Sequence, residues 1–222
     1  MNFPSPDDFF LRLKGAARDR SARLITALGI DLYMRTDDRR ILESVILPYY
    51  AGRKDFKKLI FIGCEWYTKG YNKIFTNHEY WTLDKSPCKE QYGSRLHIED
   101  NLENLDTHFQ ENELDLIICN GVLGWGLDEP ARIERAFTSS FHCLRPGGHF
   151  ILGWNDTPDH RPLPLNEITA LKAFAPCIFP ALSKHRYLTN NPNRHIYNFY
   201  HKPAIAPAQN QGRKNSPGKI LK

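Results

Sequence analysis

The stretch Leu144-Arg145-Pro146-Gly147-Gly148-His149-Phe150-Ile151-Leu152 decides the fold of this chain. The residue spacing before it predicts a helix over 130–143, and Pro146 cannot continue that helix. The two glycines allow the positive φ angles that a sharp reversal requires. The apolar triplet that follows is typical of a buried strand. A helix that ends in such a turn and leads into a strand is evidence for an α/β fold only when further segments agree with it.

Composition limits the classes of protein to consider. The 222 residues are 41% hydrophobic, which is enough for one sizeable core, and the net charge of +5 is mild. Basic and acidic residues alternate along the N-terminal half, a pattern that indicates solvated helix faces rather than a nucleic-acid-binding stripe. No apolar stretch is long enough to span a bilayer, and residues 1–8 do not resemble a signal peptide.

The cysteines bear on the compartment and on metals. Five are scattered along the chain without any C-x-x-C pair, at Cys64, Cys88, Cys119, Cys143 and Cys177. An odd, unpaired set predicts neither a disulfide framework nor a zinc site, and we expect no bound metal. A reducing cytoplasm is the expected location.

Three regions are predicted along the chain. Residues 1–56 carry two amphipathic helices, one starting at Ser5 and ending near Gly29, the other starting at Thr36 and ending near Pro48. They are expected to form a helical cap over one edge of a sheet, and the alternative is a partner-binding module. Residues 57–202 form the main domain, and residues 203–222 form a basic, disordered tail.

Strands and helices alternate in the main domain. Apolar or alternating segments at 59–62, 80–83, 94–98, 114–119 and 149–153 predict strands, with helices between the last two and around 165–174. The segments 185–188 and 195–200 predict a closing hairpin. This order indicates a mostly parallel sheet covered on both faces.

Candidate site residues follow the ends of these strands, where an open parallel sheet binds its ligands. The loop that starts at Gly63 follows the first strand, and the helix expected behind the loop would offer unpaired N–H groups to an anion. Asp84 ends the next strand about 20 residues later, a spacing at which a carboxylate accepts hydrogen bonds from a ribose diol. The alternative for Asp84 is a turn cap.

Two further loops carry polar and aromatic residues. One runs from Asn120 through Trp125, and the other starts at Trp154. Asp156 and His160 are the best acid/base candidates at this rim. Either of them could instead be an ordinary loop residue.

These segments together resemble the class I, Rossmann-like S-adenosylmethionine-dependent methyltransferases. The resemblance rests on Leu59-Ile60-Phe61-Ile62-Gly63-Cys64, Trp81-Thr82-Leu83-Asp84, Leu114-Asp115-Leu116-Ile117-Ile118-Cys119-Asn120-Gly121-Val122-Leu123 and Leu144 to Leu152, in this order. It implies a seven-stranded sheet with an antiparallel last strand and S-adenosylmethionine as cofactor.

The resemblance also implies roles for individual residues. Gly63, Cys64 and Glu65 would hold the methionine moiety, and Asp84 the ribose. Either Glu99 or Asp100 would face the adenine amine, and Asn120 and Gly121 would line the pocket beneath the sulfonium. The acceptor pocket would be shaped by four aromatic residues, Trp66, Tyr67, Trp125 and Trp154.

Three functions remain open from sequence. The first is methyl transfer to an unidentified, small-molecule acceptor. The second is a methyltransferase-like binding or assembly protein without activity, because Phe61 and Glu65 stand where the family usually has an acid and a glycine. The third, a nicotinamide-dependent oxidoreductase, lacks its glycine fingerprint here. The sequence predicts no membrane partner, argues against a nucleic-acid partner, and does not indicate an oligomeric state.

Overall fold

The structure is a computed structural model that describes residues 20–204 of the chain. The predicted helix start at Ser5 and the predicted disordered tail therefore lie outside the described residues, apart from the first residues of the tail. Residues 20–27 are helical, and Gly29, the predicted helix end, has φ of +79°. That left-handed conformation is the one that favours glycine after a helix.

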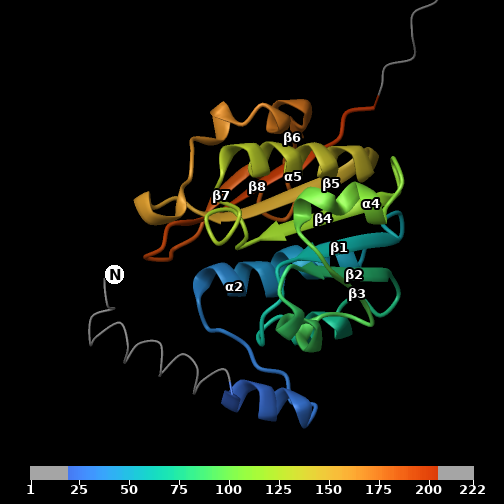
Figure 1. Ribbon diagram of the computed structural model, residues 1–222, viewed down its shortest axis with the longest axis vertical. Coiled ribbons are helices and arrows are strands. Elements are labelled where there is room, and N and C mark those ends of the chain that lie inside the picture. The colour runs from blue at the N-terminus through green and yellow to red at the C-terminus, as the bar shows by residue number, and fades with distance from the viewer. Residues whose placement is uncertain (1–19, 205–222) are drawn as a thin grey trace, which may run out of the picture.

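One mixed sheet organises the chain (Figure 1). Its strands are β1 (Lys58–Ile62), β2 (Glu79–Asp84), β3 (Leu96–Glu99), β4 (Leu114–Asn120), β5 (Leu144–Asn155), β6 (Ala175–Pro176), β7 (Arg186–Leu188) and β8 (His195–His201). Their order is β3-β2-β1-β4-β5-β8-β6, with β7 also paired to β8. The first five strands are parallel, and β8 is antiparallel to β5. The predicted Rossmann-like α/β fold is confirmed.

The sheet has eight strands rather than the expected seven. Two short strands share the outer side of β8: Ala175 of β6 pairs with His201, whereas Tyr187 of β7 pairs with Tyr197. The β7–β8 hairpin is the one predicted from sequence. The two-residue strand β6 was not predicted, because two residues carry no periodic signal.

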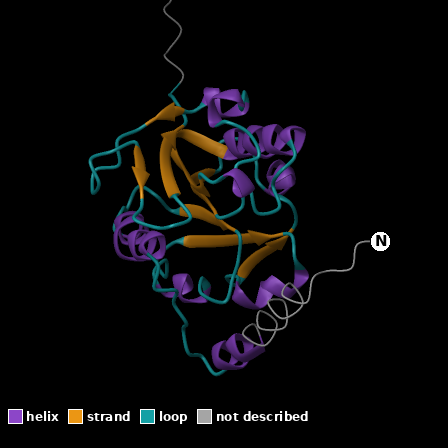
Figure 2. Ribbon diagram, turned by 90° about the vertical axis from the view of Figure 1, so that its left-hand side faces the viewer, coloured by secondary structure: helices purple, strands orange, loops and turns teal. Residues whose placement is uncertain are grey.

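Helices lie on both sides of the strands (Figure 2). The α-helices are α2 (Asp37–Ile41), α3 (Leu47–Ala51), α4 (Leu105–His108) and α5 (Pro130–Cys143), and a π-helical turn (Leu42–Ile46) joins α2 to α3. Short 3₁₀ helices cover Lys69–Lys73, Pro87–Tyr92, Leu102–Asn104, Pro158–His160, Leu165–Glu167 and Ala170–Ala173.

Two buried clusters cover the two faces of the sheet, because side chains alternate along each strand. On one face, Ile60, Ile117 and Phe150 pack with Ile133 and Phe137 of α5. The other face carries Phe61, Ile118 and Ile151, which share a cluster with residues of the α2–α3 helix. The second predicted helix, which corresponds to α2–α3, therefore covers a face of the sheet and not an edge.

Pro48 lies inside the α2–α3 helix, although the sequence predicted a helix end there. The helix continues to Ala51 and is followed by Gly52. A proline in a helix removes one hydrogen bond and clashes with the carbonyl four residues earlier. The π-helical turn immediately before it widens the backbone, and such turns accommodate this kind of interruption.

The predicted helix around 165–174 is also corrected. Two separate 3₁₀ turns replace it, because the carboxylate of Glu134 accepts the backbone N–H groups of Thr169 (2.6 Å) and Ala170 (2.7 Å). These N–H groups are then unavailable for a continuous helical ladder.

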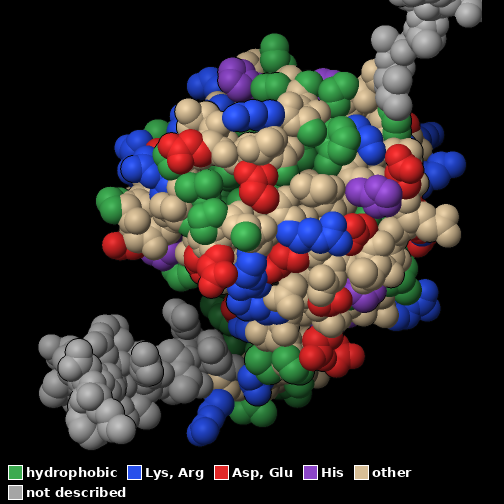
Figure 3. All heavy atoms as spheres, turned by 45° about the horizontal axis from the view of Figure 1, so that its top comes forward, with side chains coloured by type: hydrophobic (Ala, Val, Ile, Leu, Met, Phe, Trp, Pro, Cys, Tyr) green, Lys and Arg blue, Asp and Glu red, His purple; other side chains and the backbone are tan. Residues whose placement is uncertain are grey.

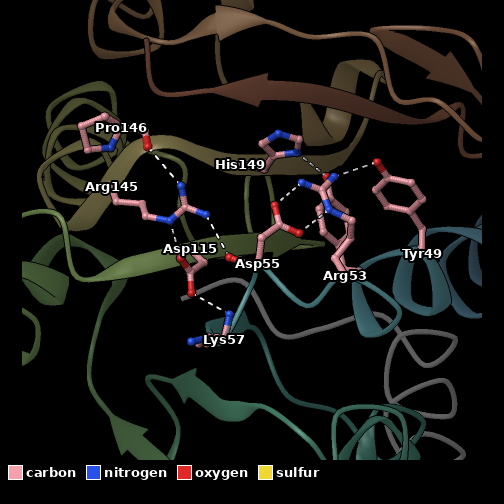
Figure 4. A network of polar contacts seen from close by, with 9 residues as sticks. Tyr49, Arg53, Asp55, Lys57, Asp115, Arg145, Pro146 and His149 are labelled. Atoms are coloured by element: carbon pink, nitrogen blue, oxygen red, sulfur yellow. Dashed lines mark hydrogen bonds and ion pairs between the residues drawn. The ribbon is translucent and has the colours of Figure 1, made fainter. Parts of the chain in front are cut away.

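The Pro-Gly-Gly turn becomes an irregular start of β5, at the edge of the sheet opposite the carboxyl ends of the parallel strands. Gly147 has φ of +75°. Asp115 of β4 binds Arg145 and accepts the backbone N–H group of Lys57 at 2.7 Å (Figure 4). It also accepts the N–H group of Lys58 at 2.8 Å. Arg145 reaches the carbonyl of Asp55 at 3.1 Å. This network fixes the amino ends of β1, β4 and β5 and belongs to the scaffold.

Candidate functional site

A cavity of about 450 Å³ lies at the carboxyl ends of the parallel strands. Its wall includes the last residues of four strands or the residues that follow them, namely Gly63 after β1, Asp84 of β2, Asn120 of β4 and Asn155 of β5. His195 joins them because β8 runs antiparallel and so begins at this edge. Open α/β sheets bind their ligands at this edge.

The turn at Gly63 contacts Asp84 on the cavity wall. Gly63 has φ of +91°, a conformation that favours glycine, and a Cβ there would also crowd Val122 Cγ2 at 3.0 Å. Asp84 Oδ2 accepts the N–H of Cys64 at 2.8 Å, and Oδ1 accepts the N–H of Ser86 at 2.9 Å. Asp84 is therefore a turn cap that also lines the cavity, and each carboxylate oxygen retains a lone pair for a ligand.

Glu65, the residue at the position where a small residue was expected, lines the cavity without closing it. Its carboxylate forms an ion pair with Lys89, which follows β2. Its backbone N–H is bonded to Thr68 Oγ1 at 3.0 Å. The Glu65 side chain is thus directed to a cationic partner. The backbone φ of Glu65 is not positive, so this position does not require glycine.

Of the two acids proposed for the adenine amine, Asp100 lines the cavity and Glu99 does not. Glu99 is exposed at the end of β3. Asp100 accepts hydrogen bonds from Asn104 (2.8 Å) and the Asn101 N–H (2.7 Å) and lies 2.8 Å from His108 Nε2. Burial raises the pKa of Asp100, but its hydrogen bonds to His108 and Asn104 outweigh this and lower the pKa below its ordinary value.

A chain of uncharged polar groups forms another part of the wall. His195 Nδ1 lies 2.7 Å from Asn155 Oδ1, and His195 Nε2 lies 3.1 Å from Asn120 Oδ1. Burial lowers the pKa of His195 to about 4, so the ring is neutral at neutral pH. A neutral imidazole donates from only one nitrogen, so one of the two amides must present its NH₂ group to the ring. The other amide atom of Asn120 is buried and has no partner within residues 20–204.

Helix α2 contributes an ionic pair, Asp38 and Arg39, to the cavity. Arg39 is 8% exposed, and its guanidinium lies 4.4 Å from the centre of the Tyr67 ring. Its Nη2 is 3.4 Å from the Tyr67 hydroxyl, and its Nε is 3.7 Å from Asp38 Oδ2. Asp38 in turn accepts a hydrogen bond from Asn191 at 2.5 Å. All four residues line the cavity.

The four aromatic residues expected to shape the pocket divide into two pairs. Tyr67 and Trp125 line the cavity, and Trp125 is 55% exposed, with its ring stacked 4.0 Å from that of His160. Trp66 does not line it. Trp154 is buried in the core on the α5 side and donates to Asn198 Oδ1 at 3.0 Å. Because side chains alternate along β5, the next residue, Asn155, is the one that lines the cavity.

The two acid/base candidates lie off the cavity wall. Asp156 forms ion pairs with Arg161 (2.9 Å), Arg194 (3.5 Å) and Arg186 (3.9 Å). His160 stacks on Trp125, and its Nδ1 lies 3.2 Å from Thr157 Oγ1. In this arrangement Asp156 ties a loop to the hairpin, and His160 supports an aromatic side chain.

Sequence reasoning placed Asn155 at the rim but missed other residues that tertiary structure brings to the cavity, notably Asp38, Arg39, Asn191 and His195. A signal existed for two of them. Arg39 precedes Leu42 and Ile46 by three and seven residues, which places it on the buried helix face. His195 begins a strand predicted to be antiparallel, and such a strand starts at the edge where parallel strands end.

Surface charge and the cysteine thiols do not indicate a second kind of functional site in the described part of the chain. On the face shown in Figure 3, basic and acidic side chains are interspersed. Among residues 20–204 there is no cluster of three potential metal ligands, and no helix there is long and apolar enough to cross a membrane. All five cysteines are free, and burial raises the pKa of the Cys64, Cys119 and Cys143 thiols to about 12.

Comparisons by sequence identify no relative: no family model and no curated protein matches. Solved structures do. The N-methyltransferase NodS from Bradyrhizobium japonicum WM9 superposes with a TM-score of 0.55 at 17% identity, covering 74% of this chain and 95% of that one. The 1,6-didemethyltoxoflavin-N1-methyltransferase from Burkholderia thailandensis, with bound substrate and S-adenosylhomocysteine, has a TM-score of 0.52 at 16% identity, over 92% of this chain and 93% of that one. The chain therefore has the fold of the class I S-adenosylmethionine-dependent methyltransferases.

Proposed function

We propose that this protein transfers a methyl group from S-adenosylmethionine to a small-molecule acceptor. The observation that carries the proposal is the position of Asp84, which ends β2, lines the cavity and contacts the Gly63 turn through the Cys64 N–H. A carboxylate at that place, beside a left-handed glycine, suits the two hydroxyls of a ribose.

The residues around the cavity fit the other parts of the cofactor. Asp100 lies near the end of β3, where its carboxylate can accept from an adenine amine. Asn120 keeps one buried amide atom without a partner in the described part of the chain, and such an atom is costly unless a ligand or water satisfies it. When bound, S-adenosylmethionine supplies an electrophilic methyl carbon on a sulfonium.

The protein's own contribution is orientation and exclusion of water. The wall formed by Asn155, His195 and Asn191 is uncharged and can position an acceptor through hydrogen bonds. No strong base is required on this wall when the acceptor is already nucleophilic. Support for a small acceptor comes from the cavity size and from the toxoflavin-type substrate bound by the Burkholderia enzyme.

A cytoplasmic location, the absence of a nucleic-acid or membrane partner and the domain limits stay predictions. The five free thiols support the reducing compartment.

The test is calorimetric titration of the full chain with S-adenosylhomocysteine, the demethylated product, with NADH as the control ligand. We expect saturable binding of the first and none of the second, together with a raised melting temperature. Absence of binding to S-adenosylhomocysteine would favour the inactive binding or assembly protein, and binding of NADH alone would favour an oxidoreductase.

A further inference from the structure

The first three backbone N–H groups of the loop after β1 are hydrogen-bonded to other groups of the protein. The N–H of Gly63 bonds to the carbonyl of Leu83 (2.9 Å), that of Cys64 to Asp84 (2.8 Å) and that of Glu65 to Thr68 Oγ1 (3.0 Å). The first three residues of the loop therefore have no free N–H group to offer to an anion. An anionic group in this cavity requires donors from elsewhere.

Arg39 supplies such donors. Its guanidinium is nine-tenths buried, yet Nη1 has no hydrogen-bond partner in the part of the chain that the structure describes. A buried guanidinium carries five N–H donors and is costly to leave unpaired. The acidic neighbour Asp38 approaches Nε at 3.7 Å, beyond hydrogen-bond length, so it does not satisfy Nη1.

The surroundings of Arg39 hold it in place. The Tyr67 ring packs 4.4 Å from the guanidinium carbon. A Cβ at Gly121 would lie 3.9 Å from Nη2, so the guanidinium is next to the turn that follows β4. The hydroxyl of Thr36, three residues earlier in the chain, is likewise buried without a partner among residues 20–204 and lines the same cavity.

A second arginine on the cavity wall provides a contrast. Arg132 forms an ion pair with Glu103 and donates to Asn101 at 3.2 Å. Its charge is therefore neutralised within the protein. Arg39 differs from it in having a buried donor left over, and this difference points to a ligand.

We propose that Arg39 and Thr36 form a carboxylate-binding site in this cavity. A carboxylate suits a guanidinium because its two oxygens can accept parallel N–H bonds. The proposal rests on the proposed function, from which two sources of the carboxylate follow: the amino-acid tail of the cofactor, or an acidic methyl acceptor.

Calorimetric titration with two nucleosides separates these sources. S-adenosylhomocysteine carries the amino-acid tail, whereas methylthioadenosine shares its adenosine and thioether but lacks the carboxylate. If the carboxylate is the cofactor's, Arg39→Gln weakens S-adenosylhomocysteine about tenfold to a hundredfold and leaves methylthioadenosine unchanged. Acetate then competes with S-adenosylhomocysteine.

If the carboxylate is the acceptor's, Arg39→Gln leaves both nucleosides unchanged. Acetate, compared with chloride at equal ionic strength, then raises the melting temperature of the wild-type complex with S-adenosylhomocysteine and not that of the variant. The matched control is Arg132→Gln, which must change the two nucleoside affinities by the same factor and leave the acetate effect intact.

Two precautions keep the outcome decisive. Arg39→Lys retains the charge without the planar fork and should show the same pattern at smaller amplitude if the glutamine variant is unfolded. If neither nucleoside binds the wild-type protein, the proposed function fails, and acetate stabilisation of the unliganded protein still tests Arg39. Equal nucleoside and acetate responses in the wild-type and Arg39 variants would overturn the site.

Discussion

Asn120 of β4 and His195 of β8 meet at 3.1 Å across the end of β5, above Gly153. A Cβ at residue 153 would lie 1.9 Å from Asn120 Oδ1 and 2.9 Å from Tyr197 Cε1. The glycine in the middle strand is therefore what allows the amide and the imidazole to meet. The polar wall of the cavity depends on a residue that does not itself line it.

Gly153→Ala should displace the Asn120 side chain and break its contact with His195. We expect a loss of about 1–3 kcal/mol in the free energy of unfolding, measured by urea titration, because the substitution overpacks a buried site and leaves polar groups unpaired. Gly52→Ala is the matched control, since a Cβ there would meet its nearest neighbours at ordinary contact distances of 3.5 and 3.6 Å. An equal loss in both variants would contradict this account.

One buried histidine, His195, and one partly buried histidine, His149, should make the protein sensitive to mild acid. Burial lowers the pKa of His149 and of His195 from 6.5 to about 4. Between those values the unfolded chain binds more protons than the folded one, so the free energy of unfolding falls as the pH drops from about 6.5 towards 4. Urea unfolding at a series of pH values measures this slope.

His149→Gln should reduce that slope without removing it, because His195 still titrates. His149 lies at the opposite edge of the sheet, 2.7 Å from the Tyr50 hydroxyl, and glutamine can keep a polar partner there. An unchanged slope in this variant would show that His149 does not contribute to the acid sensitivity.

The cysteines should differ sharply in reactivity. Cys88 is exposed, whereas Cys64, Cys119 and Cys143 are buried with thiol pKa values of about 12, and that of Cys177 is raised to about 11. Because the thiolate is the reactive form, we expect one fast-reacting thiol in the native protein with a disulfide reagent. Cys88→Ser should abolish the fast phase. Two fast phases in the native protein would contradict the burial of Cys64, Cys119 and Cys143 or the raised pKa of Cys177.

Local sequence signals predicted the scaffold and the residues at strand ends. Gly63, Asp84 and Asn120 follow runs of buried residues, and the helix Pro130–Cys143 has a proline start and clear periodicity. These features are local in sequence, so pattern reasoning reaches them.

The rest of the cavity depends on contacts between distant segments. Arg39 belongs to the α2–α3 helix, which packs on one face of the sheet. The residue it contacts, Tyr67, lies 28 residues later in the chain. Asp156 and His160 were expected at the rim because they follow β5, yet ion pairs to the hairpin and stacking on Trp125 hold them outside the wall. Tertiary packing decided both outcomes. The helical period places Arg39 on the buried face of its helix, but it does not show which distant segment that face meets.

Asp84→Asn tests the nucleoside end of the cavity. Each oxygen of the carboxylate accepts one backbone N–H group. An amide has only one oxygen, so its NH₂ group would face one of these N–H groups. The ligand would then also lose one of its two accepting atoms. We expect the affinity for S-adenosylhomocysteine to fall about tenfold to a hundredfold, measured by calorimetry below the melting temperature of the variant. The fall should be equal for methylthioadenosine, because both ligands carry the ribose. Glu99→Gln, at the neighbouring strand end and outside the cavity wall, is the matched control and should bind both ligands as the wild type does. A larger loss of affinity in the Glu99 variant than in the Asp84 variant would contradict the placement of the ribose at Asp84.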